Sequence, residues 1–140
     1  MKLSRTVSYA VHATLQLAQA NSGSPVPCSH LAAEGRMPER FLLQILRHLV
    51  THGILHSTRG VDGGYSLDRK PEEISLLDVI EAIDGPLNAM IPSNDHGEDN
   101  SESEIKLREA LEQVTDSSRR LLESIKLSDL LAKPSMATMN

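Results

Sequence analysis

The spacing of apolar residues predicts three helices in the first third of the chain. Over residues 4–20, apolar positions recur at helical spacing at Val7, Val11, Leu15 and Ala18. Glycine and proline then interrupt the pattern, and a short helix is expected over residues 29–35, with Cys28 or Ser29 near its cap. A third helix is expected over residues 38–51, where a wide apolar stripe is formed by Phe41, Leu42, Ile45, Leu46, Leu49 and Val50.

The pattern changes after this third helix. Residues 54–59 and 65–68 flank a glycine-rich run, which predicts a β-hairpin with a turn between two short strands. Ser75 is followed three residues later by Asp78, the pattern of a helix capping box. A fourth helix is therefore expected over residues 75–83.

A long final helix is expected over residues 104–131. Its apolar positions are separated alternately by four and three residues, which is typical of a helix that pairs with another helix. We predict dimerisation through Leu107, Leu111, Val114, Leu121 and Ile125. Residues 88–103 read as a solvated acidic loop, which could also hold an unknown effector or partner protein, and residues 132–140 as a flexible tail.

Composition narrows the class of protein. The 140 residues are 39% hydrophobic but only 2% aromatic, which favours helices packed on helices, with one small hairpin, over an aromatic-rich barrel. The single cysteine excludes an internal disulfide and a thiolate-only metal site within one chain. No run approaches the about 20 apolar residues of a membrane span, so we expect a cytoplasmic protein. No nucleophile–base pair or paired carboxylates suggest an enzyme.

Charge is distributed unevenly along the chain. The net charge is −5, yet residues 1–70 hold eight lysines and arginines against four acidic residues. Residues 71–140 hold six against fifteen. Such asymmetry is expected when the first half faces a polyanion, although helical surfaces also vary by chance.

The order of elements is that of a winged helix-turn-helix. In that fold the third helix lies in the major groove of DNA and the hairpin reaches the neighbouring groove or the backbone. The polar face of residues 38–51 offers Arg40 and Gln44 for base edges, and Arg47 and His48 for phosphates. Arg59 stands beside Gly60 at the hairpin, where glycine allows close approach. A merely solvated helix face and an ordinary tight turn are the alternatives.

Several segments resemble the Rrf2-type winged-helix transcriptional regulators of bacteria. The resemblance covers residues 1–87, and residues 104–127 more loosely as a dimerisation helix. It rests on runs including Tyr9-Ala10-Val11, Pro38-Glu39-Arg40-Phe41-Leu42, Ser57-Thr58-Arg59-Gly60-Val61-Asp62-Gly63-Gly64-Tyr65 and Ile74-Ser75-Leu76-Leu77-Asp78.

This resemblance implies a homodimer that binds a palindromic operator on double-stranded DNA and usually represses transcription. It also assigns residues: the start of the third helix and the wing would read DNA, through Pro38, Arg40, Phe41, Leu43, Gln44 and Arg59. Lys2 and Tyr9 fall where the family contacts the DNA backbone. Ser29, Arg47 and Gly60 complete the expected DNA-binding set.

The chain departs from the family pattern in two places. Many members hold an iron–sulfur cluster through three cysteines between the fourth helix and the long helix, but residues 88–97 contain none. Because thiolates bind the iron, no cofactor is expected. Some members also carry an acidic residue where this chain has Leu43. The apolar side chain of Leu43 cannot accept a hydrogen bond from cytosine and favours contact with a thymine methyl group. The operator is therefore expected to differ.

Three histidines and the single cysteine allow other interpretations. His48, His52 and His56 are spaced four apart, but no further ligand completes a metal shell, so no metal site is expected. Cys28 could act as a redox switch at a helix N-terminus, or it could be packed and inert. For the whole chain, the alternative function is a winged-helix protein-interaction module that no longer binds DNA.

Overall fold

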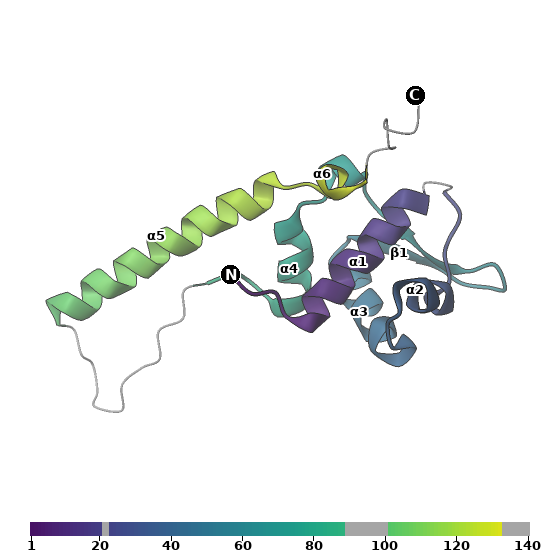
Figure 1. The fold of residues 1–140 in the computed structure, drawn as a ribbon, viewed down its shortest axis with the longest axis horizontal. Helices are drawn as coiled ribbons and strands as arrows, with labels where there is room; N and C mark the ends of the chain where they lie inside the picture. The colour runs from purple at the N-terminus through teal and green to yellow at the C-terminus, as the bar shows by residue number, and fades with distance from the viewer. Residues whose placement is uncertain (21–22, 89–100, 133–140) are drawn as a thin grey trace, which may run out of the picture.

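The computed structural model describes residues 1–20, 23–88 and 101–132. These residues form a helical body with a two-stranded hairpin, and one long helix extends from the body (Figure 1). None of the helices described is long and apolar enough to cross a membrane. The elements are α1 (Arg5–Ala20), α2 (Cys28–Gly35), α3 (Glu39–Thr51), β1 (Leu55–Thr58), β2 (Gly64–Leu67), the 3-10 helix η1 (Pro71–Glu73), α4 (Leu76–Asp84), α5 (Glu102–Ser124) and α6 (Leu127–Leu130).

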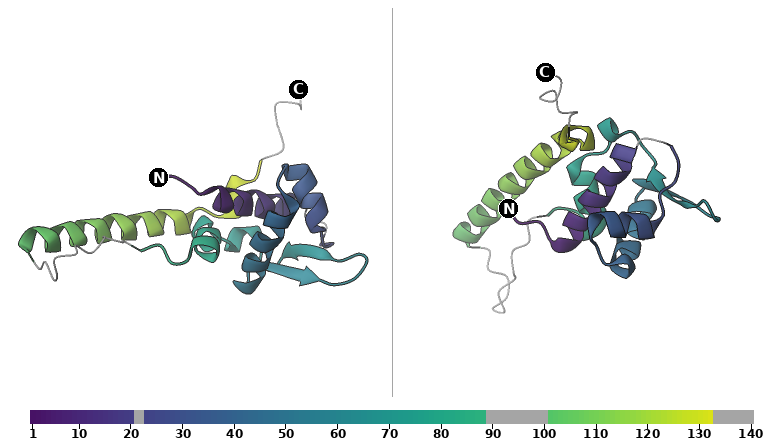
Figure 2. Two further views of the ribbon diagram at one scale, coloured as in Figure 1. Left: turned by 90° about the horizontal axis from the view of Figure 1, so that it is seen from below. Right: turned by 45° about the vertical axis from the view of Figure 1, so that its right-hand side comes forward.

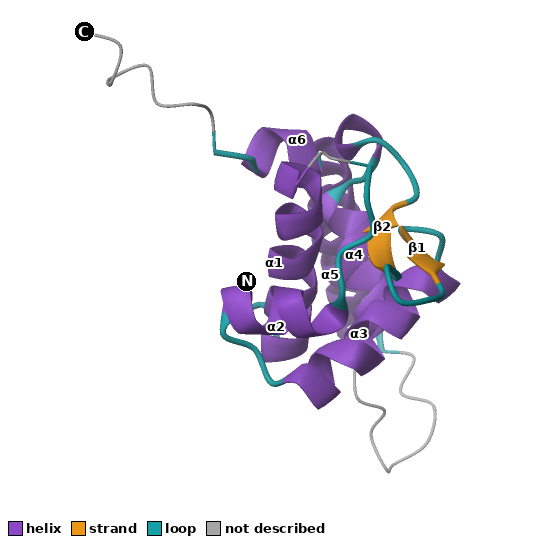
Figure 3. Cartoon of the chain, turned by 90° about the vertical axis from the view of Figure 1, so that its right-hand side faces the viewer, coloured by secondary structure: helices purple, strands orange, loops and turns teal. Residues whose placement is uncertain are grey.

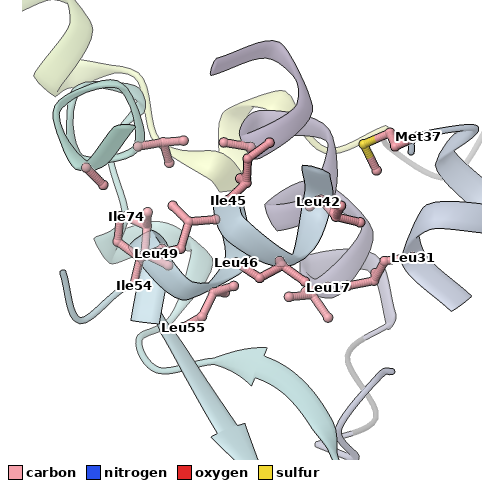
Figure 4. Close-up of a cluster of buried hydrophobic side chains, with 14 of the residues drawn as sticks. Leu17, Leu31, Met37, Leu42, Ile45, Leu46, Leu49, Ile54, Leu55 and Ile74 are labelled. Carbon is pink, nitrogen blue, oxygen red and sulfur yellow. The ribbon is translucent and has the colours of Figure 1, made fainter. Parts of the chain in front are cut away.

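The apolar face of α3 is the centre of the core. Leu42, Ile45, Leu46 and Leu49 are all buried and lie among side chains of α1, α2 and the hairpin (Figure 4). Two members of the expected stripe differ: Val50 is half-buried, and Phe41 is exposed. The core-facing side of α3 is therefore narrower at both ends than the sequence pattern predicts.

A tight turn joins α2 to α3. Arg36 has a left-handed backbone (φ 54°) and donates its N–H to the carbonyl oxygens of Ala32 and Ala33, while the Met37 N–H reaches the Ala32 oxygen at 2.8 Å. The Met37 side chain is buried in the core. The residue at the N-cap of α2 is Pro27, and no side chain caps it; Cys28, expected near the cap, is the first residue of the helix.

The hairpin is confirmed and is tied to the helical body (Figure 3). Its strands pair antiparallel from Leu55 opposite Leu67 to Thr58 opposite Gly64. Val26, which precedes α2, pairs with Tyr65 through two backbone hydrogen bonds of 2.8 and 2.9 Å. The capping box of α4 is also confirmed, since Ser75 and Asp78 exchange side-chain to backbone hydrogen bonds.

The long helix ends earlier than the sequence predicts. Helix α5 stops at Ser124, and Ile125 and Lys126 are extended, so the expectation of one helix over residues 104–131 is corrected. The cause is pairing with a distant segment: the Leu76 N–H donates to the Ile125 oxygen at 2.8 Å, and the Leu127 N–H to the Ile74 oxygen at 2.9 Å. Ile125, expected in the dimerisation seam, therefore lies outside α5.

The C-terminal end of α5 is fastened to α4. Leu122 packs in a small cluster with Val7, Leu77 and Ile80. Arg119 Nη1 lies 2.6 Å from Glu81 Oε2, and the same carboxylate oxygen accepts a hydrogen bond from the Leu87 N–H at 2.8 Å. The rest of α5 projects from the body (Figure 2). The expected acidic loop lies outside the described residues except at its ends, and so does the expected tail except for Ala132.

Candidate nucleic-acid interface

The outer face of α3 is open. Arg40, Gln44, Arg47 and His48 are all exposed, and Leu43 between them is half-buried. In Figures 1 and 2, α5 extends away from the side of the body that carries α3. The C-terminal half, as far as the structure describes it, therefore leaves the polar face of α3 uncovered.

The cations of this region carry uncompensated charge. Over residues 1–20, 23–88 and 101–132, Arg40, Arg47 and Arg59 have no ion-pair partner. By contrast, the guanidinium of Arg69 lies 3.4 Å from Asp78, and that of Arg119 lies 2.6 Å from Glu81. Exposed arginines without ion-pair partners on α3 and at the hairpin are what a polyanion would neutralise.

Phe41 and Tyr9 form an aromatic pair at the start of α3. Their ring centroids lie 5.8 Å apart at an interplanar angle of 79°, an edge-to-face contact of the favourable kind. Phe41 is still 42% exposed, because Tyr9 covers only part of its ring. Pro38, which caps α3, is exposed beside it. The structure thus brings together Tyr9 and Phe41, two residues that the family resemblance assigned separately to the interface.

The hairpin holds Arg59 and Gly60 at its exposed end. The Gly63 N–H donates to the Gly60 oxygen at 3.0 Å, which closes the turn. At Gly64, a Cβ atom would lie 2.4 Å from the carbonyl carbon of Val26, so only glycine fits this strand against Val26. The remaining interface candidates, Lys2 and Ser29, are exposed.

Cys28 lies next to the start of α3. Its Sγ is 3.7 Å from the Glu39 carbonyl oxygen, and the side chain is half-buried. Burial, and secondly the negative charge of Glu39, raise the pKa of the Cys28 thiol. Its place at the start of α2 does not make it a thiolate, which argues against the redox switch.

We therefore expect Cys28 to be a slow nucleophile. Because its pKa is raised, less thiolate is present at a given pH than in a free thiol, and only the thiolate reacts. Alkylation with iodoacetamide, followed by mass spectrometry over pH 6–10, should show a midpoint above that of a small-molecule thiol. Unfolding the chain in guanidinium should restore the ordinary midpoint. A midpoint below that of the free thiol would contradict the assignment.

The described residues offer no ready metal site. No group of three His, Cys, Asp or Glu side chains is placed to hold a metal ion within the described residues. His52 Nδ1 lies 2.8 Å from the carbonyl oxygen of His48, and His56 is on β1. An iron–sulfur cluster held by three thiolates does not fit the donor set, because Cys28 is the single cysteine of the sequence.

An apolar stripe runs along the projecting part of α5. Exposed apolar side chains at heptad spacing are Leu107, Leu111, Val114 and Leu121, with half-buried Ser118 between them. Ile105, which the sequence pattern did not single out, is also exposed. The contact of Arg119 with Glu81 was missed too, since no local pattern joins residues 38 positions apart.

A helix-turn-helix followed by a two-stranded wing and a long C-terminal helix defines the class of winged helix-turn-helix proteins. A sequence model described as "Rrf2: Iron-dependent Transcriptional regulator" matches residues 3–133. The chain belongs to the Rrf2 family, which is a family of transcriptional regulators and not of enzymes.

Individual relatives are similar over different lengths. An rrf2-like relative from Rhodobacter capsulatus is 32% identical over 141 residues, spanning 93% of this chain and 92% of the relative. A relative from Mycobacterium tuberculosis is 47% identical over 87 residues, which cover 62% of this chain and 54% of that relative. The matched part thus spans about half the length of the mycobacterial protein.

Solved structures share the fold. The structure of CymR, described as the global cysteine regulator of Bacillus subtilis, superposes with a TM-score of 0.76 at 27% identity, covering 93% of this chain and 95% of that chain. The structure of IscR from T. potens gives a TM-score of 0.71 at 28% identity, covering 98% and 96%.

Proposed function

We propose that this Rrf2-family protein is a homodimeric repressor that binds a palindromic operator in a sequence-specific manner. In this proposal the third helix, α3, enters the major groove and the hairpin acts as the wing. Arg40 and Gln44 contact base edges, while Arg47 and Lys2 contact phosphates. A dimer seated on an operator excludes other proteins from that stretch of DNA, which favours repression. A protein that binds bacterial DNA would act in the cytoplasm, which agrees with the expected location.

The observation that carries this proposal is the set of exposed arginines without ion-pair partners on α3 and at the hairpin. Arg40, Arg47 and Arg59 are exposed and have no ion-pair partner among the described residues. Neutralising phosphates with such side chains releases counterions and supplies most of the affinity for DNA.

Dimerisation is supported by the exposed stripe of α5. Leu121 is 67% exposed and Val114 62% exposed in the single chain, and heptad spacing suits a second copy of the same helix. A symmetric dimer places two α3 helices to read two half-sites, so a palindrome is expected.

We also propose that this regulator works without an iron–sulfur cluster. The single thiol, Cys28, is on α2 and has a raised pKa, whereas thiolates are needed as ligands. Leu43 is half-buried on α3, and its apolar side chain favours a thymine methyl over the amino group of cytosine. The operator should therefore differ from those of members with an acidic residue there.

Salt-dependent DNA binding tests the proposal. Fragments of the parent genome are first selected for binding, and the affinity for the selected duplex is then measured against salt concentration. We expect a steep linear fall of log affinity with log salt. Arg40→Ala and Arg59→Ala should each cost about 1–3 kcal/mol and relax sequence preference. Arg47→Ala should weaken binding to every duplex and reduce the salt slope by about one.

The matched control is Arg108→Ala. Arg108 is exposed on α5, so this variant removes the same charge far from the proposed interface and should bind like the wild type. Failure to select any fragment, with affinities that ignore salt, would refute DNA binding and support the protein-interaction module.

A further inference from the structure

The tip of the wing carries an apolar side chain that packs on nothing in the chain. Val61 is 103% exposed, more than any other large hydrophobic residue described. The remaining exposed apolar residues lie mostly on α5, where the proposed dimer would cover them. Folding of the monomer and dimerisation through α5 therefore both leave Val61 without a role.

Local turn geometry does not require valine either. The hydrogen bond from the Gly63 N–H to the Gly60 oxygen, 3.0 Å long, makes Val61 and Asp62 the two central residues of a turn. Neither has a positive φ, so many residue types fit there. Gly, Pro, Asn, Asp and Ser are the usual choices in turns, and a β-branched residue is not among them.

The turn is held at a defined place relative to α3. The strands pair in register up to Thr58 and Gly64, and Tyr65 is bonded in both directions to Val26. The backbone of Gly64 lies so close to Val26 that a Cβ atom there would clash with it. The base of the hairpin is thus fixed on the body of the protein, and Val61 lies at the tip that extends from it.

The wing and α5 project from opposite ends of the molecule (Figures 1 and 2). If α5 forms the centre of the dimer, each wing lies at an outer end. The wing tip then meets DNA at the flank of each half-site, beyond the base pairs that α3 contacts.

The chemistry of Val61 selects one kind of base pair in the minor groove. An isopropyl group can fill a groove floor lined by adenine and thymine, but it cannot accept a hydrogen bond from the guanine amino group. That amino group would lose its water without gaining a partner. Apolar side chains in the minor groove are a known mode of contact.

We propose that Val61 enters the minor groove at the outer flank of each half-site and discriminates against G·C pairs there. This inference rests on the proposed function, because it assigns a specificity residue to the same interface.

Base analogues test the groove and the residue together. The duplex selected by the wild type is remade with single flank pairs replaced by 2,6-diaminopurine·T, which adds an amino group to the minor groove alone. In G·C duplexes, inosine·C removes that group while keeping the major-groove pattern. We expect diaminopurine to weaken wild-type binding at least about fivefold at the flank pairs, and inosine to restore the affinity lost to guanine.

Two variants assign the effect to one side chain. Val61→Ser should bind the analogue and parent duplexes with a ratio near one, because serine can accept from the amino group. Val61 is fully exposed, so this change leaves no cavity. The matched control is Asp62→Asn, which removes a negative charge at the same turn. It should strengthen binding to every duplex by the same factor, so the ratio of the affinities for the parent and analogue duplexes should not change.

The outcomes separate the two proposals. A wild type that selects a duplex but ignores the analogues, or a Val61→Ser variant that keeps the full ratio, overturns the role of Val61 while DNA binding stands. A wild type that selects no duplex overturns the proposed function itself, and the role of Val61 falls with it.

Discussion

Replacing Leu111 with aspartate is expected to turn the dimer into a monomer that binds its operator poorly. Leu111 is exposed in the middle of the apolar stripe of α5, where a second copy would bury it. An unpaired charge buried in an interface costs about 3–5 kcal/mol, and a symmetric dimer contains it twice. Losing the second half-site should reduce operator affinity by a further factor of about 10²–10⁴.

Light scattering and duplex binding measure the two parts of this prediction separately. The matched control is Gln113→Asp, since Gln113 is exposed on the same helix but outside the heptad positions. It introduces the same charge and should remain dimeric. If Leu111→Asp is still a dimer by light scattering, dimerisation does not use the stripe, and another surface must join the two copies.

A polar residue within the stripe is expected to affect the strength of the proposed dimer. Ser118 occupies a heptad position between Val114 and Leu121. A polar residue at such a position lowers the stability of a helix pair while fixing its register. A dimer that buries Ser118 is therefore expected to be weaker than one with an apolar residue at that position.

Most elements of the fold could be predicted because their signals are local. The stripe of α3, the glycine-rich turn of the hairpin and the Ser75–Asp78 capping box all depend on residues a few positions apart. Such patterns indicate which side of a helix or strand is buried. The exposed polar face of α3 could be predicted from the same stripe, because it consists of the residues on the side of the helix opposite the apolar positions.

Features that depend on distant residues could not be predicted. The pairing of Val26 with Tyr65, and the break of α5 where residues 125–127 pair with residues 74–76, join segments far apart in sequence. Heptad spacing, which is a local pattern, led to the expectation of one helix through this break to residue 131, with Ile125 in the dimerisation seam. The exposure of Phe41 likewise depends on Tyr9, a contact that no spacing rule contains.

The break after α5 connects the helix proposed for dimerisation to the body that carries α3. Ile125 and Leu127 bond to the backbone on either side of Ser75, and Ser75 begins α4. Leu127 belongs to the same core cluster as Leu46 and Leu49 of α3. The orientation of α5 is thereby linked to the core on which α3 is packed, and the two halves of a dimer should hold a defined spacing.

Shortening Leu127 to alanine is therefore expected to have a large effect on stability. Its side chain is completely buried, and leucine-to-alanine changes in a core cost about 2–5 kcal/mol because they lose transfer free energy and leave a cavity. Urea unfolding followed by circular dichroism should show this loss in the free energy of unfolding. Leu130→Ala, on the same short helix but 41% exposed, should change that free energy by less than about 1 kcal/mol. Equal losses in the two variants would mean that α6 does not anchor α5 through Leu127.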